Sequence, residues 1–132
     1  RENEIDAIQA LRLLSADAAQ MPGILGFGGL GALLAASGKH QNRLEDVELL
    51  DDGRLRRHGY LFDAFEGEPG RWVLRAWPWE HGRTGLGAFL ATEAAVLGCE
   101  NALGRFAGTA HPPTLQALAS GSGAGDWLVV RL

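Results

Sequence analysis

The stretch from residue 58 to residue 100 constrains the fold most, because four short apolar runs in it are separated by glycine- and proline-rich breaks. Apolar runs bounded by such residues are typical of strands joined by turns. In the runs 60–66 and 71–79, successive side chains alternate between two faces, as strand side chains do. We therefore expect one hairpin from these two runs and a second hairpin from the runs 86–91 and 94–99.

One register of the first hairpin explains both of its faces. It places Phe62 opposite Ala76 and Asp63 opposite Arg75, so that opposite charges pair across the strands. A shift of one residue would move every side chain to the other face. We expect the apolar face to be buried and the mixed face to be half solvated. The apolar face consists of Tyr60, Phe62, Leu74 and Ala76.

Residues 2–20 predict a helix, because apolar residues recur in it at steps of three and four. Acidic residues gather near its start, where the helix dipole favours them. We expect Ile8 and Leu11 to be buried against Phe62 and Leu74. The predicted buried stripe consists of Ile5, Ile8, Leu11, Leu14 and Ala18.

Three side chains are candidate interaction residues. Leu13 lies off the apolar stripe, on the face with Asp6 and Gln20; an outward leucine is usually incidental, and the alternative is a contact with a neighbouring subunit. Trp77 and Trp79 lie on the mixed face of the hairpin, and exposed aromatic side chains mark interfaces or ligands that stack. The alternative for both tryptophans is that the C-terminal tail covers them, and the sequence leaves the two possibilities open.

The remaining segments are harder to assign. Glycine-rich sequence suggests a connector with a possible short helix near residues 30–36, and residues 47–50 suit a strand or one helical turn. In the tail, residues 112–119 suit a short helix and residues 127–131 suit a closing strand. The expected fold is a single α+β domain in which the helix packs on an antiparallel sheet of about four strands. Its expected parts are a helix (1–21), a connector (22–57), a sheet (58–99) and a tail (100–132).

Composition narrows the class of protein. The chain has 132 residues and a net charge of -4, so electrostatics give no reason to expect nucleic-acid binding. It has one cysteine, so an internal disulfide is impossible. No apolar run approaches the roughly 18 residues of a membrane-spanning helix. These features indicate one globular domain.

No catalytic, cofactor or metal motif stands out. Residues 26–31 match the letters G-x-G-x-x-G, but a predicted helix rather than a strand precedes them, so we interpret them as a connector. The neighbours Glu80 and His81 favour a solvated turn over an acid–base pair. The carboxylates of Glu48, Asp51 and Asp52 lack the spacing of a calcium loop. We expect no enzyme activity, no cofactor and no metal.

Three segments together resemble the type IV pilin-like and pseudopilin superfamily of bacteria. Residues Asn3–Arg12 are similar to the helix stretch N-E-x-x-A-I-x-x-L-R that follows the membrane-embedded half of the pilin helix. The segment Gly59–Phe62 is similar to a G-Y-x-F strand of that family. Residues Ala76–Pro78, followed by Gly82–Gly85 and Phe89, are similar to its A-x-P…G-x-T-G…F segment.

The resemblance implies a long helix packed on an antiparallel sheet, cleavage by a prepilin peptidase, and assembly with other pilin-like subunits through the helices. It also implies a place on the periplasmic or extracellular side of the envelope, with an anchor in the inner membrane. We expect an apolar segment of about 20 residues directly before Arg1, enough to span a bilayer. The alternative is a cleaved secretion signal, which has a shorter apolar core.

The expected function is structural: a non-catalytic domain of a subunit that assembles into a filament or a secretion apparatus. The alternative is a secreted or periplasmic binding module, in which Trp77 and Trp79 contact a sugar or a peptide. A third and less favoured hypothesis is a small enzyme around His81, because no converging set of catalytic residues accompanies that histidine.

Overall fold

A computed structural model describes residues 2–21, 23–37, 46–68, 71–85, 87–92, 95–99, 106–108, 112–113 and 128–130. Two helices and seven strands lie in this part of the chain. They are α1 (Glu2–Gln20), α2 (Ile24–Ser37), β1 (Glu48–Leu49), β2 (Leu55–Arg57), β3 (Tyr60–Glu68), β4 (Arg71–Pro78), β5 (Ala88–Ala91), β6 (Val96–Cys99) and β7 (Leu128–Val129).

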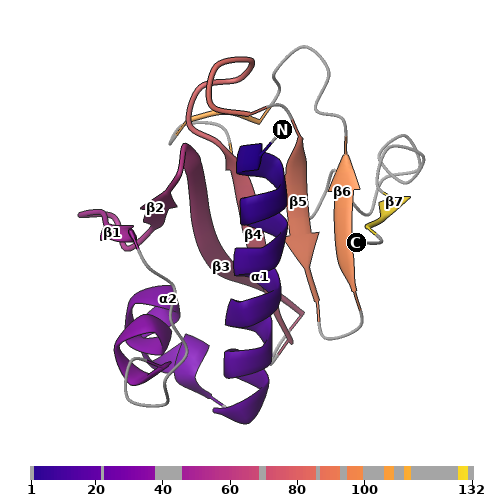
Figure 1. Cartoon of the computed structure of the whole chain (residues 1–132). Coiled ribbons are helices and arrows are strands. Elements are labelled where there is room, and N and C mark those ends of the chain that lie inside the picture. The colour runs from indigo at the N-terminus through magenta and orange to yellow at the C-terminus, as the bar shows by residue number, and fades with distance from the viewer. Residues whose placement is uncertain are drawn as a thin grey trace.

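The strands form one antiparallel meander in which each strand pairs with the next in sequence, from β1 to β7 (Figure 1). The expected α+β class is confirmed, but about four strands was too few, since the described sheet has seven. The difference comes from two-residue and three-residue strands at the two edges. β1 and β7 lie in ranges that the sequence had suggested as strands, 47–50 and 127–131, whereas the three-residue β2 has too little alternation to be recognised.

Helix α1 lies across the middle of one face of the sheet (Figure 1). The predicted burial of Ile8 and Leu11 is confirmed, and both belong to one core cluster with Phe62 and Leu74. The predicted burial of Ile5 is wrong, because 40% of this residue is exposed. The buried side of α1 also contains Ala7 and Ala10, whose small side chains let the helix approach the sheet closely.

The register predicted for the β3–β4 hairpin is confirmed. Phe62 pairs with Ala76 and Asp63 pairs with Arg75. Of the apolar face, Tyr60, Phe62, Leu74 and Ala76 are all buried. The second hairpin, β5–β6, and the closing strand β7 also lie inside the predicted ranges.

The described part of residues 22–57, expected to be a connector with a possible short helix and a possible strand, contains α2, β1 and β2. The helix expected near residues 30–36 begins earlier, at Ile24, and is interrupted where Gly29 has a φ of 66°. Glycine lowers helix propensity, but burial of Leu25, Leu30 and Leu33 stabilises the helix by tertiary packing. The helix expected at residues 112–119 falls mainly outside the described residues.

Candidate functional site

The segments that carry the family resemblance meet at the N-terminal end of α1. The turn between β2 and β3 is His58-Gly59, and both residues have positive φ, of 49° and 80°. Such a two-residue turn matches the twist of the strands that it joins. A Cβ on Gly59 would lie 2.6 Å from Cβ of Thr84, so a side chain there would collide with the loop after β4. Glycine at this position therefore lets the hairpin turn and that loop come together.

Hydrogen bonds also connect these segments. We call the residues that make them the junction: Asn3, Glu4, Tyr60, Thr84 and Gly87. The amide of Asn3 donates to the carbonyl of Thr84 at 2.8 Å, and the backbone N–H of Gly87 donates to the carboxylate of Glu4 at 2.6 Å. The hydroxyl of Tyr60 donates to the carbonyl of Gly87 at 2.7 Å. The start of α1 is therefore tied to both β3 and the loop that leads into β5.

The Tyr60 ring is enclosed within the junction. It is fully buried, and a Cβ on Gly85 would overlap it, so glycine at position 85 makes room for the ring. Burial raises the pKa of the Tyr60 phenol far above its ordinary value, and the nearby Glu4 carboxylate raises it further. The phenol therefore remains a hydrogen-bond donor at every physiological pH.

The side of α1 that faces away from the sheet carries a row of exposed, uncharged residues, bordered by the 39% exposed side chain of Asp6. We call it the outer stripe; it consists of Ile5, Gln9, Leu13, Ala16 and Gln20, all exposed. The predicted outward position of Leu13 is confirmed, with 40% of the residue exposed. Charged residues usually cover the exposed side of a helix. An uncharged stripe of this kind is suited to packing against another helix.

The two candidate tryptophans occupy different environments. The expectation that Trp77 stands on a half-solvated face is wrong, because its exposure is 0%. Its indole N–H donates to the carbonyl of Gly108 at 2.7 Å, and Phe106 belongs to the same buried cluster. Trp79 is partly exposed, and the guanidinium of Arg56 lies 5.1 Å from the centre of its ring. The tail thus covers Trp77, which was the alternative left open by the sequence.

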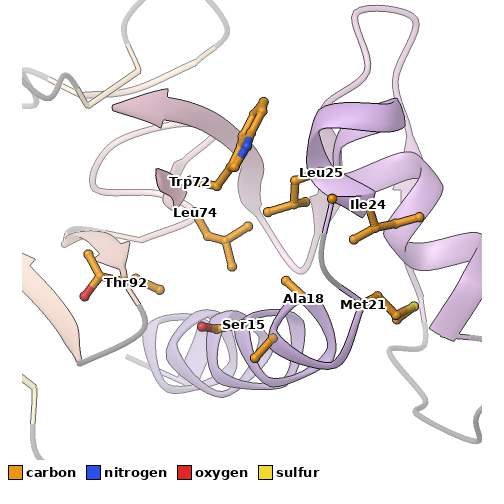
Figure 2. A pocket seen from close by; sticks show the side chains of 11 residues that line it. Ser15, Ala18, Met21, Ile24, Leu25, Trp72, Leu74 and Thr92 are labelled. Carbon is orange, nitrogen blue, oxygen red and sulfur yellow. The ribbon is translucent and has the colours of Figure 1, made fainter. Parts of the chain in front are cut away.

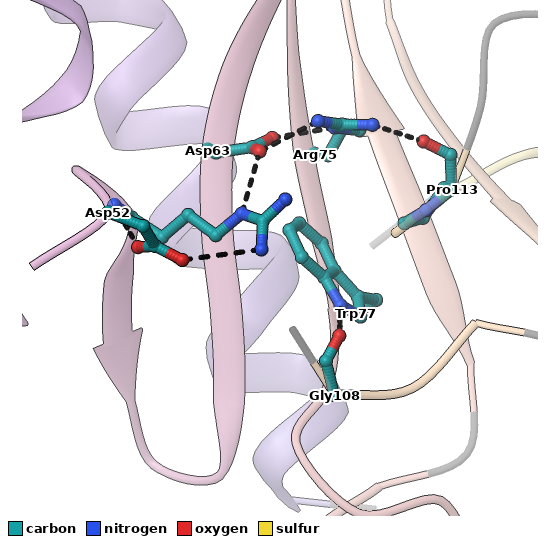
Figure 3. A network of polar contacts seen from close by, with 7 residues as sticks. Asp52, Asp63, Arg75, Trp77, Gly108 and Pro113 are labelled. Carbon is teal, nitrogen blue, oxygen red and sulfur yellow. Dashed lines mark hydrogen bonds and ion pairs between the residues drawn. The ribbon is translucent and has the colours of Figure 1, made fainter. Parts of the chain in front are cut away.

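A network of ion pairs lies on the face of the sheet that carries Trp77 (Figure 3). Arg75 donates to both oxygens of Asp63, at 2.6 and 2.7 Å, and Arg54 donates to Asp63 at 3.2 Å. Arg75 also donates to the carbonyl of Pro113 at 2.5 Å. Since the Asp63 and Arg75 side chains are only 14% and 12% exposed, this pair is more buried than its predicted solvated position implied. The network joins β3, β4 and the tail.

A hollow of about 260 Å³ lies where the end of α1 meets the start of α2 and the strands β4 and β5 (Figure 2). We call it the α1 hollow. Among the described residues, no acidic or basic side chain lines it, and the polar side chains that line it are those of Ser15, Thr92 and Trp72. Its other lining residues include Ala18, Ala19 and Ile24.

The residues considered for catalysis do not converge. Glu80 lies 3.6 Å from Arg83 in an ion pair at the surface, and Thr84 closes the same turn by accepting from and donating to the Glu80 backbone. The G-x-G-x-x-G letters fall inside α2, after another helix. Within the described residues, no group of three or more histidine, cysteine, aspartate or glutamate side chains is placed to hold a metal ion.

Sequence reasoning did not find the junction. Asn3, Glu4 and Thr84 had appeared only as letters of the resemblance, and nothing local to them indicates that they touch. None of the helices in the described ranges is long and apolar enough to cross a membrane. Comparison with family models, with curated proteins and with solved structures found no match to this chain.

Proposed function

We propose that this chain is the globular domain of an envelope-anchored pilin-like or pseudopilin subunit, with a structural and non-catalytic role. The observation that carries the proposal is the junction. Asn3, Glu4, Tyr60 and Thr84 come from the three segments that resemble the family; Asn3 bonds directly to Thr84, and Glu4 and Tyr60 both bond to Gly87, which lies between Gly85 and Phe89 of the third segment.

The contacts at the first turn of α1 suit a helix that fixes the orientation of the globular domain relative to an anchor at its N-terminal end. Two hydrogen bonds, made by Asn3 and Glu4, tie the first turn of α1 to the loop before β5, and the buried Tyr60 bonds to the same loop, so the direction of the helix relative to the sheet is set at its N-terminal end. In the proposed subunit, an apolar helix before Arg1 anchors the domain in the inner membrane and places it on the periplasmic or extracellular side. The outer stripe then faces the other pilin-like subunits.

The binding-module alternative has less support. It needs Trp77 and Trp79 together on an open face, but Trp77 is buried and hydrogen-bonded to the tail. Of the two, only Trp79 retains exposed surface, and Arg56 lies over its ring.

Two measurements test the proposal. The coding sequence upstream of Arg1 should encode an apolar segment of about 20 residues; a start codon adjacent to Arg1, or a polar upstream region, would contradict the anchored subunit. In the complete gene product, Leu13→Lys should abolish sedimentable assemblies, because a charge would be desolvated in the helix interface. Leu49→Lys is the matched control, since Leu49 is an exposed leucine away from α1. Equal assembly of both variants would contradict the role of the outer stripe.

A further inference from the structure

We propose that residues 106–108 and 112–113 form a strap that opens by itself while α1 and the sheet stay folded. The strap covers the face of the sheet opposite α1, where Phe106 joins a buried cluster that contains Trp77. Its opening therefore does not depend on the anchored-subunit role proposed above. The strap is distinguished by its contacts, by its separation from the main core and by the single cysteine that lies beneath it.

The strap is bound to the sheet through main-chain groups of its own (Figure 3). The indole N–H of Trp77 donates to the carbonyl of Gly108 at 2.7 Å, and the N–H of Gly108 donates to the carbonyl of Pro78 at 3.0 Å. Arg75 donates to the carbonyl of the buried Pro113 at 2.5 Å. These three partners all belong to β4. Opening of the strap therefore breaks hydrogen bonds with a single strand and leaves the pairing of β4 with β3 and β5 in place.

The apolar contact of the strap is separate from the main core. Phe106 belongs to the cluster on the side away from α1, and the other buried members of this cluster lie in β3, β4, β5 and β6. Both helices pack instead against the opposite face of the sheet. Loss of the strap would leave that packing intact. Segments that bury little apolar surface open locally, at a lower free energy than the whole domain.

The row of side chains beneath the strap contains a reporter of its opening. Ala88 pairs with Cys99, and the register of β4 with β5 continues to place Trp77 opposite Ala88. The backbone of Cys99 therefore lies about 10 Å from that of Trp77, at about 4.8 Å per strand. Cys99 is 6% exposed and shares the buried cluster with Phe106. Opening of the strap should expose the Cys99 thiol to a reagent in solution.

Alkylation of Cys99 by iodoacetamide, followed by mass spectrometry of the 132-residue chain, measures the opening. The native chain should react more slowly than the unfolded chain, because the thiol is buried. At low urea the rate should stay nearly constant, since a local opening exposes little surface, and it should rise steeply only where the domain unfolds. A rate that follows global unfolding at every urea concentration would overturn the inference. A rate equal to that of the unfolded chain would overturn it too.

Two glycine variants separate local opening from global unfolding. Gly108 has a φ of 67°, and a Cβ there would lie 3.6 Å from the nearest atom, so Gly108→Ala strains the strap without a clash. It should raise the low-urea alkylation rate about fivefold or more. Gly53→Ala is the matched control, because Gly53 has a φ of 87° in the turn before β2 and an added Cβ meets no atom within 4 Å. It should leave the rate unchanged. Equal rates in the two variants would overturn the inference.

A second pair of variants compares the two faces of the sheet. Phe106→Ala removes the side chain that the strap inserts, so it should raise the low-urea rate at least about tenfold while the melting temperature stays nearly unchanged. Leu11→Ala removes a fully buried side chain on the opposite face, so it should lower the melting temperature without raising that rate. If Leu11→Ala does not fold, Ile8→Val provides a milder loss in the same core. Equal acceleration by variants of the two faces would show that only global unfolding exposes Cys99, and would overturn the inference.

Discussion

Replacement of Tyr60 by phenylalanine tests the junction directly. The variant keeps the buried ring but removes the hydroxyl that donates to Gly87 at 2.7 Å. A net hydrogen bond contributes about 0.5–1.5 kcal/mol, and an unsatisfied buried acceptor costs about 1–3 kcal/mol. We therefore expect a loss of about 1–2 kcal/mol in the free energy of unfolding at neutral pH. The assay is urea denaturation followed by circular dichroism.

The pH dependence of this loss is the sharper test. In the folded chain the pKa of Tyr60 is raised by burial and by Glu4, whereas an unfolded tyrosine ionises near its ordinary value of about 10. Below that pH both states hold the proton, and the full contribution of Tyr60 to stability is present. Above it the unfolded state releases the proton while the folded state keeps it, so stability falls as the pH rises.

The size of the effect follows from linkage. One pH unit above the unfolded pKa, the wild-type chain should lose about 1.4 kcal/mol that Tyr60→Phe does not lose. The stability difference between the two proteins should therefore nearly vanish at about pH 11. Groups common to both proteins cancel in this difference. Because the chain has a single tyrosine, its ultraviolet absorbance reports this ionisation alone. A difference that stays constant with pH, or a native tyrosine that ionises near its ordinary pKa, would refute the enclosed junction.

Three further substitutions test the core and the covered face. Leu11→Ala should cost about 2–5 kcal/mol in denaturant melts, because Leu11 is fully buried; the control Ile5→Ala should stay within about 0.5 kcal/mol, and equal losses would contradict the packing of α1. Asp63→Asn should cost about 1–3 kcal/mol, because it removes the carboxylate that the partly buried Arg75 and Arg54 share; Arg54 still pairs with Asp52. The control Asp52→Asn, at a side chain 45% exposed, should cost less than about 0.5 kcal/mol, and the reverse order would contradict the network. Trp77→Phe removes the indole hydrogen bond to the tail, so limited proteolysis should cleave the tail faster at unchanged sheet content; an unchanged cleavage rate would count against the covering role of this bond.

Local patterns were sufficient to predict α1 and the β3–β4 register. The helix follows from apolar residues three and four positions apart, and the placement of Asp63 opposite Arg75 follows from alternation along two adjacent runs. Both predictions depend on residues close in sequence, so the local pattern of side chains is enough to make them. The same reasoning failed for α2, where a glycine-rich run is held helical by burial of Leu25, Leu30 and Leu33.

Most of the candidate site could not be predicted from the sequence, because it is formed by contacts between residues far apart in the chain. Leu13 could be placed outward from the helical period alone, because the buried side of α1 was evident. Whether Trp77 is exposed depended on Phe106 and Gly108, about 30 positions further along, and no period connects them. Glu4 meets Gly87 across an even longer separation. The sequence by itself determined the period, the register and the side of α1 that is buried. Only the tertiary structure decided which faces are covered and which distant groups meet, because those depend on how separately formed elements pack.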